Sequence, residues 1–64
     1  MGSPEGLREA FLKAYSNLPI KTREEIIVVI DDKPISWNAA YIEVKGNTKL
    51  GEEILEKLRK MGIL

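Results

Sequence analysis

The sequence predicts a small α+β domain ordered as helix, β-hairpin and helix, with residues 1–64 forming a single domain. Two segments with helical spacing of apolar residues enclose a run of β-branched residues, and turn residues follow that run directly. A chain of this length buries only about 60% of the surface that it exposes when unfolded. We therefore expect a thin core.

The first helix is predicted over residues 4–17. Ser3 is a good N-cap, and Pro4 suits the first helical position, where a backbone N–H is not needed. Apolar residues then recur three and four positions apart. Pro19 ends the helix because it lacks a backbone N–H and disfavours helical backbone in the residue before it. Residues 1–3 are interpreted either as a disordered start or as an expression remnant.

Two signals compete in the next segment. Thr22 and Glu25 match a capping box, which would begin a second helix. The residues that follow, IIVVI at 26–30, are all β-branched and favour a strand. We predict a strand over 24–31. Residues 31–34, with the sequence DDKP, are typical of a turn, so the chain is expected to fold back as a hairpin.

Residues 35–45 are predicted as the second strand, with a helix as the alternative. The strand needs a bulge at Ala39-Ala40 to keep its apolar residues on one face. As a helix, the segment would have Ser36 as N-cap and Gly46 just after its end, but its polar residues do not gather on one side.

The last helix is predicted over residues 49–61, with Thr48 as its N-cap. Gly51 lies on its apolar side and would let another backbone approach closely. Gly62 suits the position just after the helix. The apolar stripe of this helix consists of Leu50, Ile54, Leu58 and Met61.

The first strand is apolar on both faces, with Ile27 and Val29 on the face opposite to Val28 and Ile30. A sheet with one wet face should alternate polar and apolar residues, so both faces of this strand need cover. Either one helix covers each face, or a second copy of the chain covers one of them. Because the core is small, we expect a homodimer, with the two hairpins joined edge to edge into a four-stranded sheet.

The composition excludes several kinds of chemistry. The chain has ten basic and ten acidic residues, and neither histidine nor cysteine. Disulfides, thiolate chemistry, Ser-His or Cys-His catalysis and most zinc sites are therefore ruled out. Zero net charge makes nucleic-acid binding unlikely. We predict no catalytic, cofactor-binding or metal-binding residue and a non-enzymatic protein. It has no apolar run of membrane-spanning length and no signal peptide, which favours the cytoplasm.

The leading predicted function is a module that self-associates and binds a protein partner. Its predicted interface consists of five residues, Ile27, Val29, Trp37, Asn38 and Tyr41. Aromatic residues with a polar group are frequent at protein interfaces, but they also fill cores and stack on bases. The first alternative function is weak binding of single-stranded nucleic acid by Trp37 and Tyr41, aided by lysines and arginine at 45, 49, 57, 59 and 60. The least favoured function is a metal-assisted enzyme in which Asp31 and Asp32 hold Mg²⁺, because a hairpin turn needs such residues anyway.

Residues 18–58, LPIKTREEIIVVIDDKPISWNAAYIEVKGNTKLGEEILEKL, resemble the short conserved-hypothetical proteins of thermophilic archaea. Their most distinctive string is ISWNAAYIEV. A charged content of 31% and the absence of glutamine and cysteine also favour a thermophilic source. The resemblance covers about two thirds of the chain. It implies a cytosolic protein, contains no catalytic or ligand motif, and assigns no functional residue.

Overall fold

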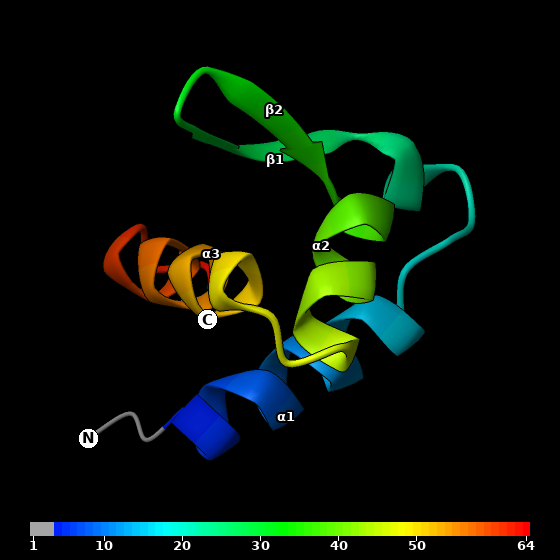
Figure 1. Cartoon of the computed structure of the whole chain (residues 1–64). Helices are drawn as coiled ribbons and strands as arrows, with labels where there is room; N and C mark the ends of the chain where they lie inside the picture. Colours follow the sequence, from blue (N-terminus) through cyan, green and yellow to red (C-terminus); the bar gives the residue numbers. More distant parts are fainter. Residues whose placement is uncertain (1–3) are drawn as a thin grey trace.

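The structure is a computed structural model that describes residues 4–64. The two strands form one antiparallel hairpin, and the helices all lie on the same side of it (Figure 1). The predicted α+β class is confirmed, with one helix more than expected. The elements in chain order are α1 (Pro4–Ser16), a 3₁₀ turn η1 (Thr22–Glu24), β1 (Ile26–Ile30), β2 (Lys33–Ser36), α2 (Trp37–Lys45) and α3 (Lys49–Lys60).

The first helix agrees with its prediction to within one residue at its end. The predicted cap at Ser3 lies outside the described residues. Phe11 is fully buried, so α1 faces the core with the apolar stripe that the spacing indicates. After Pro19, the residues of the predicted capping box form only the single turn of η1, in which Lys21 is the N-cap and no side chain makes a cap hydrogen bond. The β-branched run that follows forms β1. Consecutive branched side chains are crowded in a helix but pack well in a strand.

A two-residue turn connects the strands. Asp31 and Asp32 have φ angles of 51° and 66°, in the left-handed region. Two successive left-handed residues match the twist of a hairpin, and aspartate tolerates this conformation better than most residues do. The predicted hairpin is confirmed, with Ile30 opposite Lys33 and Val28 opposite Ile35. Its turn is shorter than the predicted 31–34, because residues 33 and 34 already pair in β2, and β1 is shorter than the predicted 24–31.

The hairpin register slips between Ile26 and Val28, where β1 holds one residue more than β2. This irregularity changes the face on which the start of β1 lies. Ile27 is partly buried and packs against the core, although the alternation of a regular strand would place it beside Val29. Ile27 and Val29, which were expected to share the second face of β1, therefore lie on different faces.

The prediction of a strand over 35–45 is wrong beyond Ser36. The last link of the hairpin is a hydrogen bond of 3.1 Å from the Trp37 N–H to the Glu25 carbonyl, and α2 starts at Trp37. Ser36 acts as the N-cap, since its hydroxyl oxygen accepts a 3.1 Å hydrogen bond from the Ala39 N–H. The helix buries Ala40 and Val44, which are four residues apart on one face. No bulge is then needed at Ala39-Ala40.

α2 ends in a way that differs slightly from the helical alternative. Gly46 has a φ of −81° and belongs to the last turn, whereas Asn47 takes the left-handed conformation with a φ of 55°. The Thr48 N–H then bonds back to the Glu43 carbonyl at 3.1 Å, and the Asn47 N–H bonds to the Val44 carbonyl. This is the pattern of a Schellman motif, in which asparagine replaces the usual glycine.

α2 and α3 approach closely at Gly51, as the sequence predicts. A Cβ atom on Gly51 would lie 2.5 Å from the Glu43 carbonyl oxygen. Thr48 is the N-cap of α3, with its hydroxyl oxygen accepting a 2.9 Å hydrogen bond from the Gly51 N–H. The predicted caps at both ends of α3 are confirmed, because Gly62 has a φ of 80° and follows the last turn.

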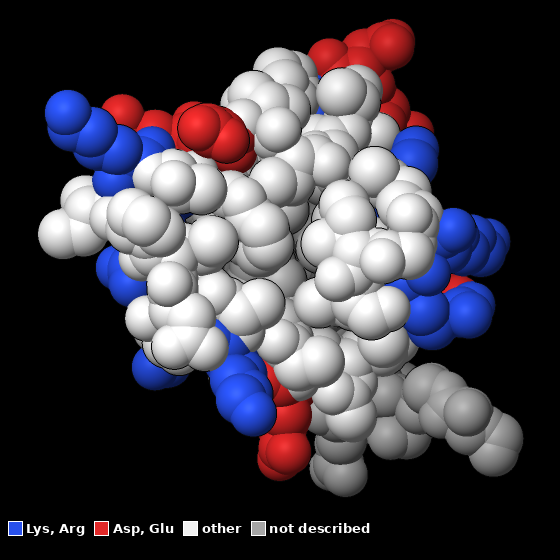
Figure 2. All heavy atoms as spheres, turned by 180° about the vertical axis from the view of Figure 1, so that it is seen from behind, with Lys and Arg blue, Asp and Glu red and all other residues white. Residues whose placement is uncertain are grey.

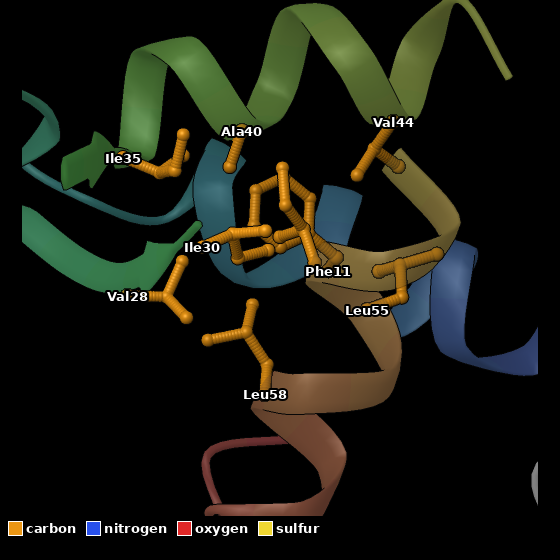
Figure 3. Packing of buried hydrophobic residues seen from close by; sticks show 9 residues of the cluster. Phe11, Val28, Ile30, Ile35, Ala40, Val44, Leu55 and Leu58 are labelled. Atoms are coloured by element: carbon orange, nitrogen blue, oxygen red, sulfur yellow. The ribbon is translucent and has the colours of Figure 1, made fainter. Parts of the chain in front are cut away.

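The core lies between the hairpin and the three helices. Figure 3 shows Val28 and Ile30 of β1 pointing toward Phe11 of α1 and Leu58 of α3. Met61, predicted to continue the apolar stripe of α3, is 51% exposed because the helix has passed the edge of the core there. The buried hydrophobic residues of the core are Phe11, Val28, Ile30, Ile35, Ala40, Val44, Ile54, Leu55 and Leu58.

Candidate functional site

An aromatic cluster lies between α1 and α2. Phe11 stacks with Trp37 at a centroid distance of 5.5 Å, and Tyr15 stacks with Tyr41 at 4.2 Å. The Tyr15 hydroxyl donates a 2.6 Å hydrogen bond to Asn38 Oδ1. The structure therefore brings together the predicted Trp37, Asn38 and Tyr41. Trp37 is partly buried and packs against the core, so core packing describes its main contacts.

Two cations lie beside this cluster. The guanidinium carbon of Arg23 is 4.4 Å from the centroid of the Tyr15 ring. Lys45 Nζ is 5.6 Å from the centroid of the Tyr41 ring, and it donates a 3.2 Å hydrogen bond to the Tyr41 hydroxyl. Contacts of this kind stabilise a fold by about 0.5–1 kcal/mol at exposed sites. The Tyr15 ring is thus contacted by Tyr41 and by Arg23, and the Tyr41 ring stacks on Tyr15 while Lys45 lies beside its hydroxyl. These contacts reduce the ring surface on which a nucleic-acid base would stack.

The side of the hairpin that points away from the helices is apolar. Opposite residues of an antiparallel pair share a face, so the register places Val29 and Pro34 on this side, together with Ile26 and Ser36. Ile26 is 54% exposed, Val29 is 49% exposed, and Pro34 is also exposed. We call Ile26, Val29 and Pro34 the outer face. The helices all lie on the other side and leave it uncovered.

The surface seen from behind the view of Figure 1 has few charges at its centre. Figure 2 shows an uncharged area that runs from the hairpin, at the top, down across the middle of the molecule. Lys, Arg, Asp and Glu side chains lie around its margin. White marks every residue that is neither acidic nor basic, so this view shows where charge is sparse.

The five residues of the predicted interface do not share one surface, and Ile27 packs against the core. Trp37 and Tyr41 stack on α1, Asn38 bonds to α1, and only Val29 belongs to the outer face. Sequence reasoning missed Ile26 and Pro34 as parts of that face. The register slip turns Ile26 outward, and a regular alternation along β1 contains no signal for it.

The turn residues Asp31 and Asp32 serve the hairpin, since both hold the left-handed conformation that a two-residue connection requires. A carboxylate pair needs further oxygen ligands to hold Mg²⁺. Within residues 4–64, no three or more acidic side chains gather into a group that could hold a metal ion.

The basic residues considered for nucleic-acid binding are scattered or engaged with neighbours. Lys57 Nζ donates a 3.1 Å hydrogen bond to the Val29 carbonyl of β1. Arg59 forms an ion pair with Glu56, and its hydrogen bond lowers the pKa of the Glu56 carboxyl. Lys45 bonds to Tyr41. Lys49 and Lys60 are exposed at opposite ends of α3.

A small hollow of about 80 Å³ lies where α1 meets the connection between α2 and α3. Val44, Gly51 and Leu55 contribute apolar surface to it, and Arg8 lies at its side. Arg8 donates hydrogen bonds to the carbonyls of Val44 and Lys45 at 3.4 and 3.5 Å, so it stabilises the end of α2. Cofactor pockets measure about 300–1,000 Å³, so this hollow is too small for one.

Comparison of the chain with protein-family models, with curated proteins and with solved structures finds no significant match. The helices described over residues 4–64 do not combine the length and the apolar character needed to cross a membrane.

Proposed function

We propose that the protein is a non-enzymatic interaction module that associates with a second copy of itself through the outer face. The observation that carries the proposal is the exposure of Ile26 and Val29, at 54% and 49%, on a sheet face that none of the helices described over residues 4–64 covers. Burial of apolar surface is favourable by about 25 cal/mol of free energy for each Å² removed from water. The outer face is thus the region of the hairpin that gains most from a partner.

A second copy is the occupant that the composition favours. The chain has zero formal net charge, so two copies do not repel each other at long range. A two-stranded hairpin is only marginally stable by itself in water, and the helices cover just one of its faces. A copy of the same hairpin offers an apolar surface of matching size and shape across a two-fold axis.

A protein surface is favoured over nucleic acid as the partner. The tyrosine rings of the aromatic cluster are engaged with each other and with Arg23 and Lys45. Binding to a nucleic-acid backbone depends on a basic surface that neutralises phosphates, and this chain carries equal numbers of acidic and basic residues. A cytoplasmic site of action fits the absence of cysteine and is part of the same proposal.

Light scattering coupled to size-exclusion chromatography tests the proposal over a concentration series. We expect a mass near twice 7.2 kDa for the natural chain. Val29→Lys should shift it toward the monomer, because a charge would have to be buried without a partner. Ile42→Lys is the matched control, since Ile42 is an apolar residue of α2 that is 66% exposed and lies outside the outer face.

Two results contradict the proposal. One is a natural chain that remains monomeric at every concentration. The other is a Val29→Lys variant that stays as dimeric as the Ile42→Lys control while its circular dichroism shows an unchanged fold.

A further inference from the structure

Within residues 4–64, the edge of β1 that faces away from β2 has no neighbouring strand, and it is a different surface from the outer face. A hairpin of two strands leaves one edge of each strand without a neighbouring strand. Exposed edges pair with other strands unless something blocks them. The two edges of this hairpin carry different blocking groups.

The register decides which backbone groups point to the free edges. A two-residue turn closes with the hydrogen-bonded pair Ile30 and Lys33, and pairs along an antiparallel ladder alternate between bonded and non-bonded. The next pair, Val29 and Pro34, is therefore non-bonded, and its backbone groups point outward. On β2, Pro34 has no N–H to offer to another strand.

The edge of β1 is blocked from outside the hairpin. The Val29 carbonyl, which points outward, accepts the 3.1 Å hydrogen bond from Lys57 Nζ of α3. To reach it, the Lys57 side chain must extend from α3 to the edge of β1, with its charged end at the carbonyl. A strand that approached this edge would have to displace an ammonium group and a hydrogen bond.

We propose that Lys57 blocks the free edge of β1 and so prevents its antiparallel pairing with β1 of a second copy. The occupant is argued from the segment itself. Residues 26–30, IIVVI, are all β-branched, uncharged and free of proline, and such segments pair readily with copies of themselves. The proposal goes beyond the proposed function, because the outer face and this edge are separate surfaces.

The test compares Lys57→Met with Lys60→Met by light scattering over the same concentration series. Both variants lose one positive charge from the last turns of α3, but of these two lysines only Lys57 donates a hydrogen bond to β1. We expect the mass of Lys57→Met to rise to at least double that of the natural chain, with a gain of antiparallel β signal in the infrared amide band. Lys60→Met should keep the natural mass.

A third variant, Lys57→Arg, keeps a long cationic donor and should restore the natural mass. Circular dichroism of each variant before the concentration series confirms that the three have folded. The proposal is overturned if Lys57→Met keeps the natural mass, or if Lys57→Met and Lys60→Met assemble to the same extent. Because each variant is compared with the natural chain, a natural chain that is monomeric would refute the proposed function and leave this test valid.

Discussion

Replacing Gly51 with alanine tests how closely α2 and α3 approach each other. In an exposed helix, alanine is more stable than glycine by about 1 kcal/mol. Here the new Cβ would lie 2.5 Å from the Glu43 carbonyl oxygen, about 0.9 Å inside the 3.4 Å at which ordinary contact begins. The obstacle is backbone, so the two helices must separate. Insertion of a methyl group into a packed site costs about 1–3 kcal/mol, and a gap of 0.5–1 Å forfeits a quarter to a half of the contact energy around it.

Because the overlap is about 0.9 Å and the obstacle is backbone, the cost lies in the upper part of this range, at about 2–3 kcal/mol. After the gain of about 1 kcal/mol in helix propensity, we expect Gly51→Ala to lower the free energy of unfolding by about 1–2 kcal/mol. For a domain of this size, each 1 kcal/mol corresponds to a fall in Tm of about 4–8 °C. Urea unfolding followed by circular dichroism measures the change. Glu53→Ala, at an exposed position on the same helix, is the control and should lie within about 0.5 kcal/mol of the natural chain. A Gly51→Ala variant that is as stable as the natural chain, or more stable, refutes the close approach.

Two further substitutions test the elements on either side of β2. Ser36→Ala should lower the free energy of unfolding by about 0.5–2 kcal/mol in the same urea assay, because the Ala39 N–H loses its acceptor. The control is Ser16→Ala, which should change it much less, because the Ser16 hydroxyl bonds to the Lys13 carbonyl inside α1. A similar loss in both would show that the cap contributes nothing. Asp32→Gly should be more stable than Asp32→Ala by about 1 kcal/mol, because glycine adopts the φ of 66° without strain; equal urea midpoints would contradict the left-handed turn.

The aromatic cluster between α1 and α2 was predicted in part. The sequence singles out Trp37, Asn38 and Tyr41 because they combine aromatic surface with polar groups, and these residues do lie together. Their partners, Phe11 and Tyr15, belong to α1, and no local pattern indicates which side of α2 will face that helix. A helix at 37–45 places Trp37 and Tyr41 four residues apart on one side, and this spacing directs both of them toward α1.

The role of Lys57 lies beyond sequence reasoning. At the end of an amphipathic helix, a lysine is fully explained by the helix dipole and by solvation. Its bond to the Val29 carbonyl joins residues that are 28 positions apart, and only the packing of α3 beside β1 brings them within reach.

Local signals were sufficient wherever they agreed with one another. The sequences of the first and last helices each combine a predicted cap, an apolar stripe and a terminating residue. β1 is favoured by five branched side chains in succession. The turn at Asp31 and Asp32 follows from the residues that tolerate left-handed backbone. In each of these elements, neighbours close in sequence supply most of the preference.

The tertiary structure decided the segments whose local signals conflict. For residues 37–45, the sequence signals for a strand (alternation) and for a helix (an N-cap) were of similar strength. The segment forms a helix because this conformation buries Ala40 and Val44 in the space between the hairpin and α3. The register slip likewise turns Ile27 into the core and Ile26 outward. Burial depends on residues far away in the chain. A pattern along the sequence therefore shows that both a strand and a helix are possible, but it does not contain the difference in free energy between them.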